Sequence, residues 1–307
     1  MSRSQRYKDI QLAQLRGFTL AATEGNFTTA AKALGTSVPT VWQQVRALEH
    51  KLGATLIWRR GRLLELTPEG RLLLELIQPH VNALDSLERL FETRRAELPQ
   101  QLNVAATYYL FADHLPACFQ EFTAQHPTVR LNLRASIWPD VVRAVERGEV
   151  DLGLVSYAPE APRSPHLSYE PIFPLYFTLF TSNRHPLARK KRVTPADLVQ
   201  YPIISSTKAT FGHQTLERIL RKHDLFERIH VIMESPSTDL LRKYVALDLG
   251  IALAYVSERN PPFPGLTWRI FDPTLEPVLV YLIHRKGAHL SSPVLAFREV
   301  VRSLLGK

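Results

Sequence analysis

A short segment between residues 38 and 50 carries side chains that can read base edges. Gln43 and Arg46 share one outer face at about 100° per residue, flanked by Thr40, whereas Val41 and Val45 fall on the opposite, apolar face. Gln can pair bidentately with adenine, Arg with guanine, and Thr can contact a thymine methyl. The same residue types also solvate ordinary helix faces, so this helix alone leaves both interpretations open.

The elements around this helix predict a helix-turn-helix with a wing. Two helical patterns precede it and end at Gly25 and Gly35, and short helices joined by a glycine-containing turn form this motif. Residues 56–60 and 63–66 then predict a β-hairpin with arginines at its tip. Such arginines can enter the minor groove or bind phosphate beside the helix. The arginines are Arg59, Arg60 and Arg62.

The charge distribution indicates a polyanion partner at one end of the chain. The 307 residues carry a formal charge of +9. Residues 1–71 hold 11 Lys and Arg against 5 Asp and Glu, and the remainder holds 27 against 24. A basic head on a nearly neutral body is typical of nucleic-acid binding, although an anionic membrane surface or simple solubility would produce the same charge.

A long gapless run of residues from Phe18 to Gly70 carries a family resemblance. Its motifs are Ala30-Ala31, Leu34, Ser37, Pro39, Gln44, Leu48-Glu49, Leu52-Gly53, Leu56, Arg59 and Leu66-Thr67-Pro68-Glu69-Gly70. This stretch resembles the LysR-type transcriptional regulators. The resemblance implies binding to double-stranded DNA as a dimer or tetramer, and an influence on DNA bending and RNA polymerase contact.

Two positions on the predicted DNA face depart from that family's usual pattern. Val38 stands where the family commonly has Gln, and Trp42 where it commonly has Ser. Trp42 either lies against sugar and thymine methyls or packs against a neighbouring helix. The complete predicted DNA-binding set is Ser37, Val38, Pro39, Thr40, Trp42, Gln43, Arg46, Arg59, Arg60 and Arg62.

A long helix over residues 68–97 is predicted to form the homodimer interface. Thr67 caps it and Pro68 occupies its first position, while Pro79 should kink it. Its apolar positions follow a heptad spacing that His80 interrupts, so the alternative is a helix lying on its own domain. The apolar positions are Leu73, Ile77, Leu84, Leu87 and Phe91, and His80 occupies the position between Ile77 and Leu84.

The remaining two-thirds predicts a two-lobed α/β domain. Leu98-Pro99-Gln100 looks like a hinge, and strands then alternate with helices, as parallel sheets require. This resembles the periplasmic-binding-protein-like (type 2) effector domain of the LysR family, with a ligand cleft between lobes. The expected organisation is a winged helix-turn-helix over 1–67, the linker helix over 68–97 and an effector domain over 98–307. Lobe I takes about 100–161 and 266–307, and lobe II about 162–265.

Strand ends that open onto helices supply the candidate effector contacts. Hydroxyls and free N–H groups at helix starts suit a carboxylate, sulfate or phosphate, but Ser and Thr are also ordinary cap residues. Ser237–Val245, Leu249–Ile251 and Tyr201–Ile204 look similar to the sulfur-assimilation regulators. Tyr109-Leu110 stands where that branch has polar residues, so the alternative to sulfate is an organic anion against a bulkier aromatic wall. The candidates are Thr107, Tyr108, Tyr109, Trp138, Ser205, Ser206 and Thr207.

Other function classes find little support in the sequence. No Gly-x-Ser-x-Gly elbow, His-Glu-x-x-His, P-loop or Rossmann fingerprint occurs, so we expect no enzyme, no metal and no cofactor beyond a small-molecule effector. A transport binding protein would need a signal peptide, and its function would give no reason for a basic N-terminal segment. No apolar run predicts a transmembrane helix, so we expect a cytoplasmic protein without a membrane partner. The single cysteine, Cys118, is expected to face the core.

Overall fold

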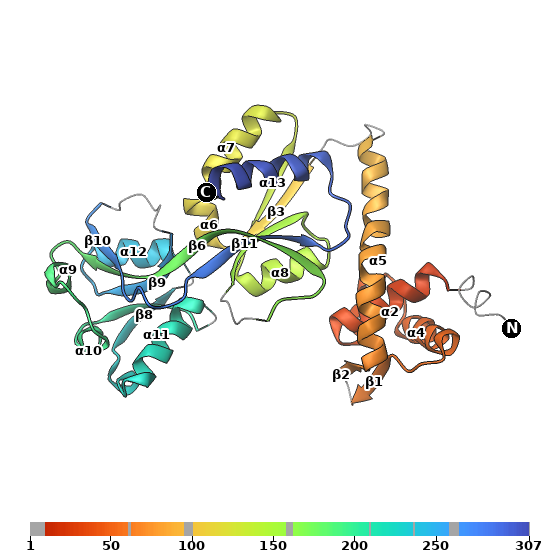
Figure 1. The fold of residues 1–307 in the computed structure, drawn as a ribbon, viewed down its shortest axis with the longest axis horizontal. Coiled ribbons are helices and arrows are strands. Elements are labelled where there is room, and N and C mark those ends of the chain that lie inside the picture. Colours follow the sequence, from red (N-terminus) through yellow and green to blue (C-terminus); the bar gives the residue numbers. More distant parts are fainter. Residues whose placement is uncertain are drawn as a thin grey trace. The chain divides into compact units, whose positions relative to one another are not determined.

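A computed structural model describes residues 10–60, 63–94, 101–157, 162–208, 210–235, 237–257 and 264–306. The chain divides into two compact units (Figure 1). The first unit comprises residues 1–98 with the short segments 164–168 and 285–291. The second comprises residues 99–163, 169–284 and 292–307.

The first unit begins with three packed helices and a hairpin. Gly25 ends α2 and Gly53 ends α4, and both adopt a positive φ. The sequence predicted the helix end at Gly25. Asn26 caps α3 by accepting a hydrogen bond from Thr29 N at 2.7 Å. The elements are α2 (Leu12–Glu24), α3 (Phe27–Ala33), α4 (Val38–Leu52), β1 (Ile57–Arg60) and β2 (Leu63–Leu66).

Helix α5 (Pro68–Arg94) has two different faces. Gln78, Asn82 and Ser86 are buried, and Asn82 Nδ2 donates to Lys286 O at 2.8 Å within the same unit. An apolar row on α5 is exposed instead. Leu73 and Ile77 of the predicted heptad are partly buried against the helical core of the same unit. In this part of α5 the exposed row is formed by Leu72 and Leu76, each one residue before the predicted position. The exposed apolar side chains are Leu72, Leu76, Leu84, Leu87 and Phe91.

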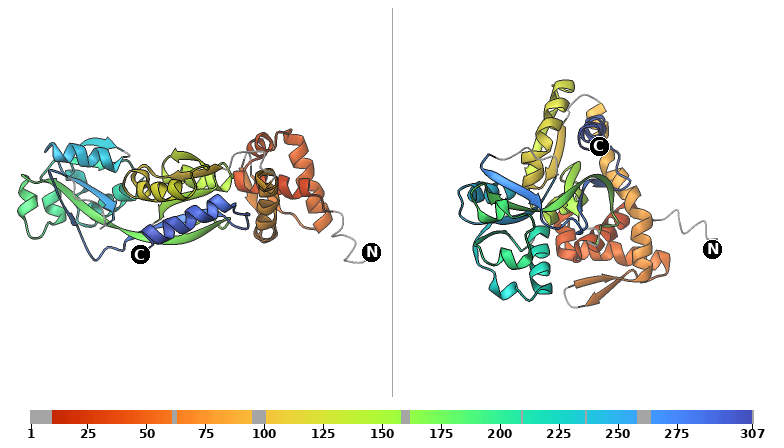
Figure 2. Two further views of the ribbon diagram at one scale, coloured as in Figure 1. Left: turned by 90° about the horizontal axis from the view of Figure 1, so that it is seen from above. Right: turned by 60° about the vertical axis from the view of Figure 1, so that its left-hand side comes forward.

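The second unit is built on a mixed sheet. Strand β3 (Gln101–Ala106) lies parallel to β4 (Arg130–Ala135) and to β5 (Leu152–Tyr157), as the strand-helix alternation predicts. The sheet is not wholly parallel as expected, because β11 (Val278–Arg285) returns from the second group of strands and pairs antiparallel with β5. Helices α7 (Leu115–Gln125) and α13 (Ser292–Leu305) pack together beside it (Figure 2). The shorter helices are α6 (Tyr108–Asp113) and α8 (Trp138–Glu146).

The long strand β6 (Leu167–Ser182) joins this first lobe to a second lobe. Its later residues pair antiparallel with β9 (Ala252–Val256) and β10 (Leu266–Ile270), so the chain returns to the first lobe only at β11, beyond the predicted residue 266. Parallel strands β7 (Ile203–Ser206) and β8 (Val231–Ser235) form a separate small sheet. The helical elements here are α9 (Pro186–Arg189), α10 (Pro195–Leu198), α11 (Phe211–Lys222), η1 (Phe226–Arg228) and α12 (Thr238–Ala246).

Candidate nucleic-acid interface and effector cleft

Helix α4 separates an apolar inner face from an outer face as predicted. Val41, Val45 and Leu48 are buried in a cluster with the other helices of this unit. Ser37 caps the helix and accepts a hydrogen bond from Thr40 N at 3.3 Å. Within the unit the outer face is open to solvent: Ser37, Val38, Pro39, Trp42, Gln43 and Arg46 are exposed, and Thr40 is half-buried.

Trp42 is exposed rather than packed into the core of its own unit. Its side chain is 44% exposed, and the guanidinium carbon of Arg46 lies 5.4 Å from the centre of the indole ring. This cation–π distance links the two outer-face side chains. The indole thus supports the arginine that is predicted to read a base.

Glu49 is a positioning residue that the sequence analysis named only as part of a motif. One carboxylate oxygen accepts hydrogen bonds from Leu56 N at 2.8 Å and Ile57 N at 3.2 Å. The other oxygen accepts from Arg46 Nη1 at 2.9 Å. A single buried carboxylate therefore joins the recognition helix to the start of the hairpin, which explains the Leu48-Glu49 motif physically.

The hairpin itself pairs as predicted, and the structure describes its arms. Arg59 lies opposite Leu64 and Arg60 opposite Leu63 in the antiparallel register of β1 and β2. Leu64 N donates to Gly25 O at 3.0 Å, which docks the hairpin on the end of α2. Arg62 lies outside the described residues, and only the backbone of Arg59 and Arg60 is described.

The Thr67-to-Gly70 motif fixes the start of α5. The Thr67 hydroxyl donates to Thr55 O at 2.7 Å and accepts from Gly70 N at 2.8 Å. A Cβ at Gly70 would collide with the carbonyl oxygen of Leu56, so only glycine permits this close approach.

The second unit contains a small cavity where helices from both lobes begin. Its volume is about 110 Å³. Helices α8, α11 and α12 start at Trp138, Phe211 and Thr238, and each of these first residues lines the cavity. The polar lining consists of hydroxyls, without a charged side chain among the described residues. These hydroxyls belong to Thr107, Tyr108, Tyr109, Ser136, Ser156, Ser206, Thr210, Thr238 and Tyr255.

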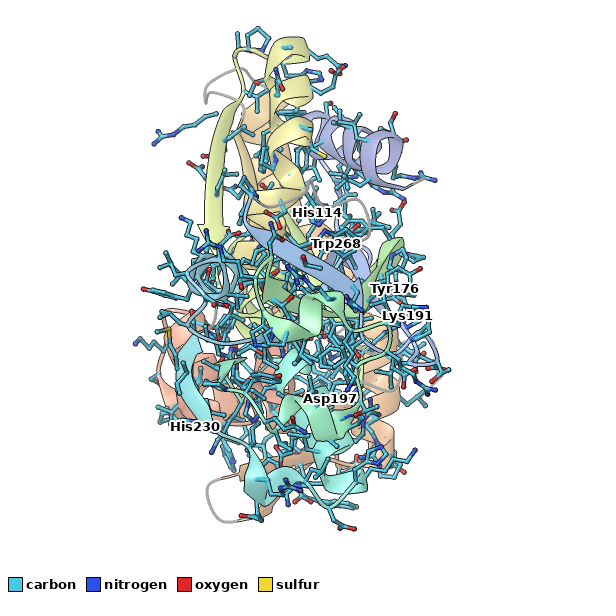
Figure 3. All side chains as sticks on the ribbon, turned by 90° about the vertical axis from the view of Figure 1, so that its left-hand side faces the viewer. His114, Tyr176, Lys191, Asp197, His230 and Trp268 are labelled. Atoms are coloured by element: carbon cyan, nitrogen blue, oxygen red, sulfur yellow. The ribbon has the colours of Figure 1, made fainter. Side chains whose placement is uncertain are left out.

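Five of the seven predicted effector residues line this cavity, namely Thr107, Tyr108, Tyr109, Trp138 and Ser206. Ser205 and Thr207 do not line it. Ser205 is buried and its hydroxyl donates to Ser206 O at 3.0 Å. The Tyr109 hydroxyl is also engaged, because it accepts from Ser257 N at 2.9 Å and lies 3.0 Å from His114 Nε2; His114 is labelled in Figure 3.

The sequence analysis missed hydroxyls that reach the cavity from β5, from α12 and from the loops before α8 and α11. Ser136, Ser156, Thr210 and Thr238 all line it. Thr238 could have been predicted from the sequence, because Ser237 is a typical helix cap and Thr238 is the first residue of α12. In the structure the Ser237 hydroxyl accepts a hydrogen bond from Leu240 N at 3.4 Å. Ser156 lies within a strand, where nothing in the sequence marks the face that it presents.

A buried ion pair joins the two lobes next to this cavity. Arg242 of α12 is 1% exposed, and its Nη2 lies 2.8 Å from Asp113 Oδ2 at the end of α6. Asp239 is a second partner of the same guanidinium. Burial raises the pKa of Asp113, and the neighbouring Arg242 opposes that effect.

Cys118 is buried, as predicted. Burial raises the pKa of its thiol to about 11, so the thiol stays protonated near neutral pH. Among the described residues, no cluster of three His, Cys, Asp or Glu side chains could hold a metal ion. No described helix is both long and apolar enough to span a bilayer.

Comparison with known proteins decides the family. Residues 95–306 match the LysR substrate binding domain, and residues 12–71 match the bacterial regulatory helix-turn-helix protein, lysR family. The chain belongs to the LysR family. It is a LysR-type transcriptional regulator with a DNA-binding helix-turn-helix and an effector-binding domain, which confirms the predicted fold class and family.

Similar proteins extend over most of this regulator. It is 31% identical over 255 residues to the transcriptional regulator CysB of Burkholderia cenocepacia, covering 82% of this chain and 80% of CysB. It is 27% identical to the RuBisCO operon transcriptional regulator of Allochromatium vinosum, covering 96% of each chain. Both of these relatives are named as transcriptional regulators.

Solved structures support the fold. HinK of Pseudomonas aeruginosa has a TM-score of 0.57 at 18% identity and covers 97% of this chain and 99% of its own. CbnR in complex with its target DNA has a TM-score of 0.52 at 22% identity and covers 95% of this chain and 99% of its own.

Proposed function

We propose that this regulator binds promoter DNA through the outer face of α4 and the hairpin, and that a small anion in the cavity of the second unit is its effector. The observation that carries the effector assignment is the meeting of three helix starts and many hydroxyls at one cavity. Backbone N–H groups and the helix dipole favour an anion at such a place.

Unused hydroxyls support the anion assignment. Thr107, Ser156 and Thr238 have no hydrogen-bond partner for their hydroxyls among the described residues. A ligand could accept hydrogen bonds from all three without displacing an existing bond. Because no described lining residue carries a carboxylate, an anion in the cavity meets no like charge.

The cavity volume limits the effector's size. At about 110 Å³ it is well below the range of about 300–1,000 Å³ typical of drug-sized ligands. Sulfate, phosphate or a short carboxylate fits this limit. The resemblance to the sulfur-assimilation branch is compatible with an inorganic anion.

A thermal-shift experiment tests the effector class. Sodium sulfate, phosphate and acetate are each compared with sodium chloride at equal ionic strength. At 100 times the dissociation constant, a ligand of the native state stabilises it by about 2.7 kcal/mol. We expect at least one anion to raise the melting temperature of the wild type but not of the double variant Ser156→Ala/Thr238→Val.

A matched control separates cavity binding from a general salt effect. Thr123 is an exposed threonine on α7 whose hydroxyl bonds its own helix, so Thr123→Val should keep the full response. If none of the three anions stabilises the wild type beyond chloride, or if the cavity variant responds equally, the anion assignment is wrong.

We further propose that the regulator acts as a homodimer through α5 in the cytoplasm, without catalytic activity. The exposed apolar row on α5 supports this assembly, since a two-fold dimer would present two α4 helices to a pseudo-palindromic site. Effector binding would change lobe closure, and thereby DNA bending and RNA polymerase contact. Assembly of dimers into homotetramers is part of the same proposal and rests on the family resemblance.

A further inference from the structure

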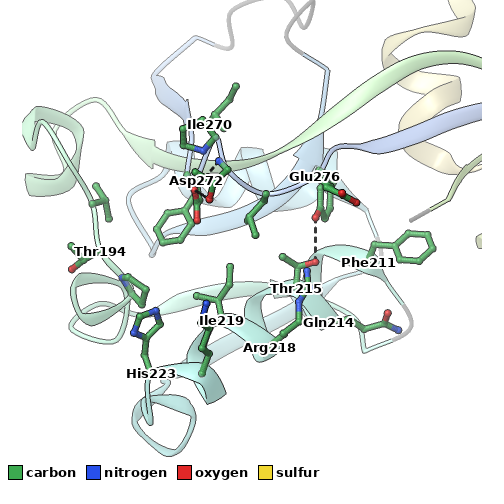
Figure 4. A pocket seen from close by; sticks show the side chains of 18 of the residues that line it. Thr194, Phe211, Gln214, Thr215, Arg218, Ile219, His223, Ile270, Asp272 and Glu276 are labelled. Carbon is green, nitrogen blue, oxygen red and sulfur yellow. Dashed lines mark hydrogen bonds between the residues drawn. The ribbon is translucent and has the colours of Figure 1, made fainter. Parts of the chain in front are cut away.

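The second lobe carries a wide groove with a volume of about 1,680 Å³ (Figure 4). Helix α11 and the chain segments 191–196 and 269–276 form its walls. This volume exceeds the range of about 300–1,000 Å³ typical of small-ligand pockets. The groove can therefore accommodate a much larger ligand than the effector cavity can.

The floor of the groove is apolar and continuous with the core of the second lobe. Ile219, Phe271 and Leu275 line the groove and pack, partly buried, against buried core residues. Leu225 and Val193, themselves buried in that core, complete the floor. Covering these side chains with an apolar ligand would remove further apolar surface from water.

The rim of the groove is basic. Lys191, Arg192, Arg218 and Lys222 are exposed there, and none has a carboxylate within 4.0 Å among the described residues. Lys191 is labelled in Figure 3 and Arg218 in Figure 4. Arg269 is held in place because its guanidinium donates to Ala188 O at 2.6 Å and also to Lys190 O.

Acidic groups in the groove are fewer than basic ones. Asp272 and Glu276 face five Lys and Arg side chains in the lining. Hydrogen bonds from Thr274 lower the pKa of Asp272 first, and the nearby charges of Arg192 and Lys222 lower it further. The positive field at the rim thus exceeds what the groove's own carboxylates neutralise.

The groove and the effector cavity share a wall but remain distinct. Trp138, Phe211, Tyr255 and Val278 line both. The rings of Trp138 and Phe211 stack with centroids 5.7 Å apart and an angle of 22° between their planes. None of the basic rim residues lines the cavity. Substitutions at Arg218 and Lys222 therefore leave the cavity lining unchanged.

We propose that this groove is a second ligand site, for an amphipathic organic anion. Its carboxylate or sulfonate would lie at Arg218 and Lys222, and its apolar body would cover the Ile219, Phe271 and Leu275 floor. This inference is independent of the effector class assigned to the cavity. It also gives a role to Lys191 and Arg192, the only two residues of the basic segment 184–192 that line the groove.

Decanoate below its micelle concentration is a suitable probe, with isothermal titration on the full chain. We expect binding to the wild type and a dissociation constant about tenfold or more higher for Arg218→Gln/Lys222→Gln, which removes two charge-assisted contacts. The control Arg184→Gln/Lys243→Gln removes the same charge from exposed positions outside the groove lining. It should bind decanoate as the wild type does.

Two further measurements locate the site and test its chemistry. Decanoate should slow hydrogen exchange in residues 214–225 and 269–276, and the uncharged analogue decanol should bind at least about tenfold more weakly. Excess sodium sulfate, which has no apolar part, should leave decanoate binding in place. The proposal is wrong if the wild type does not bind decanoate, if both double variants bind equally, or if protection falls outside the groove.

Discussion

At the scale of single residues, the pair of Arg242 and Asp113 has the least access to water of the ion pairs between described residues. Both charged groups are buried, and Arg242 is paired with Asp113 and also with the less buried Asp239. Removing Asp113 leaves the buried Arg242 guanidinium with only part of its compensating charge, which is more costly than losing an exposed pair.

We predict that Asp113→Ala lowers the free energy of unfolding of the second unit by about 3 kcal/mol, the low end for breaking a buried pair, because Asp239 still faces Arg242. Asp140→Ala removes the same carboxyl group from an exposed pair with Arg143 and should cost about 0–1 kcal/mol. Urea unfolding of both variants measures the difference. Equal losses would contradict a structural role for the buried pair.

Trp42 has a predicted role through its neighbour Arg46. Trp42→Ser removes the cation–π contact that supports the guanidinium, which is worth about 0.5–1 kcal/mol at exposed sites. Operator affinity should therefore fall about two- to fivefold. Fluorescence anisotropy measures it, and an unchanged affinity would remove Trp42 from the interface.

At the scale of elements, Asp197 holds the α9–α10 segment together (labelled in Figure 3). Its carboxylate accepts from Lys190 Nζ at 2.5 Å and from Thr194 N at 2.8 Å. The Lys190 hydrogen bond is the largest cause that lowers the pKa of Asp197, followed by the bond from Thr194. A depressed carboxyl pKa adds stability above the unfolded value of about 3.9, and that stability is lost as the pH falls through the folded value.

We therefore predict that Asp197→Asn destabilises the fold at pH 7 by about 1.5 kcal/mol, the low end for hydrogen bonds to charged groups. The difference from the wild type should shrink as the pH falls from about 5 towards 3. Urea unfolding at several pH values measures it, with the exposed Glu299→Gln as control. A difference that is constant with pH would contradict the assigned cause.

Local sequence patterns were sufficient for the elements that carry their own periodicity. The face of α4 could be predicted because Val41, Val45 and Leu48 repeat at helical spacing. The effector cavity could be predicted only in part, because Thr107, Ser156 and Thr238 meet through strand pairing and lobe packing. No local spacing encodes such meetings. For the same reason the return of the chain at β11 and the Arg242–Asp113 pair were not predicted.

At the scale of the whole molecule, α5 should set the oligomeric state. Leu87 and Phe91 are 56% and 59% exposed on its apolar row. Leu87→Glu/Phe91→Glu places two like charges in the proposed interface, and we predict a shift from dimer to monomer in sedimentation equilibrium. Leu295→Glu/Leu304→Glu alters equally apolar, exposed positions on α13 and should leave the dimer intact. Equal behaviour of both variants would contradict dimerisation through α5.

DNA binding by the outer face of α4 is the central claim, and one titration tests it most directly. A duplex selected by binding to the full chain is titrated at two salt concentrations with the wild type, Arg46→Gln and the control Arg143→Gln, whose side chain lies in the second unit. The wild-type affinity should fall steeply with salt as counterions are released. Arg46→Gln should lose about 1–3 kcal/mol of binding and Arg143→Gln none. No duplex binding at low salt, or equal affinities for all three proteins, would contradict the claim.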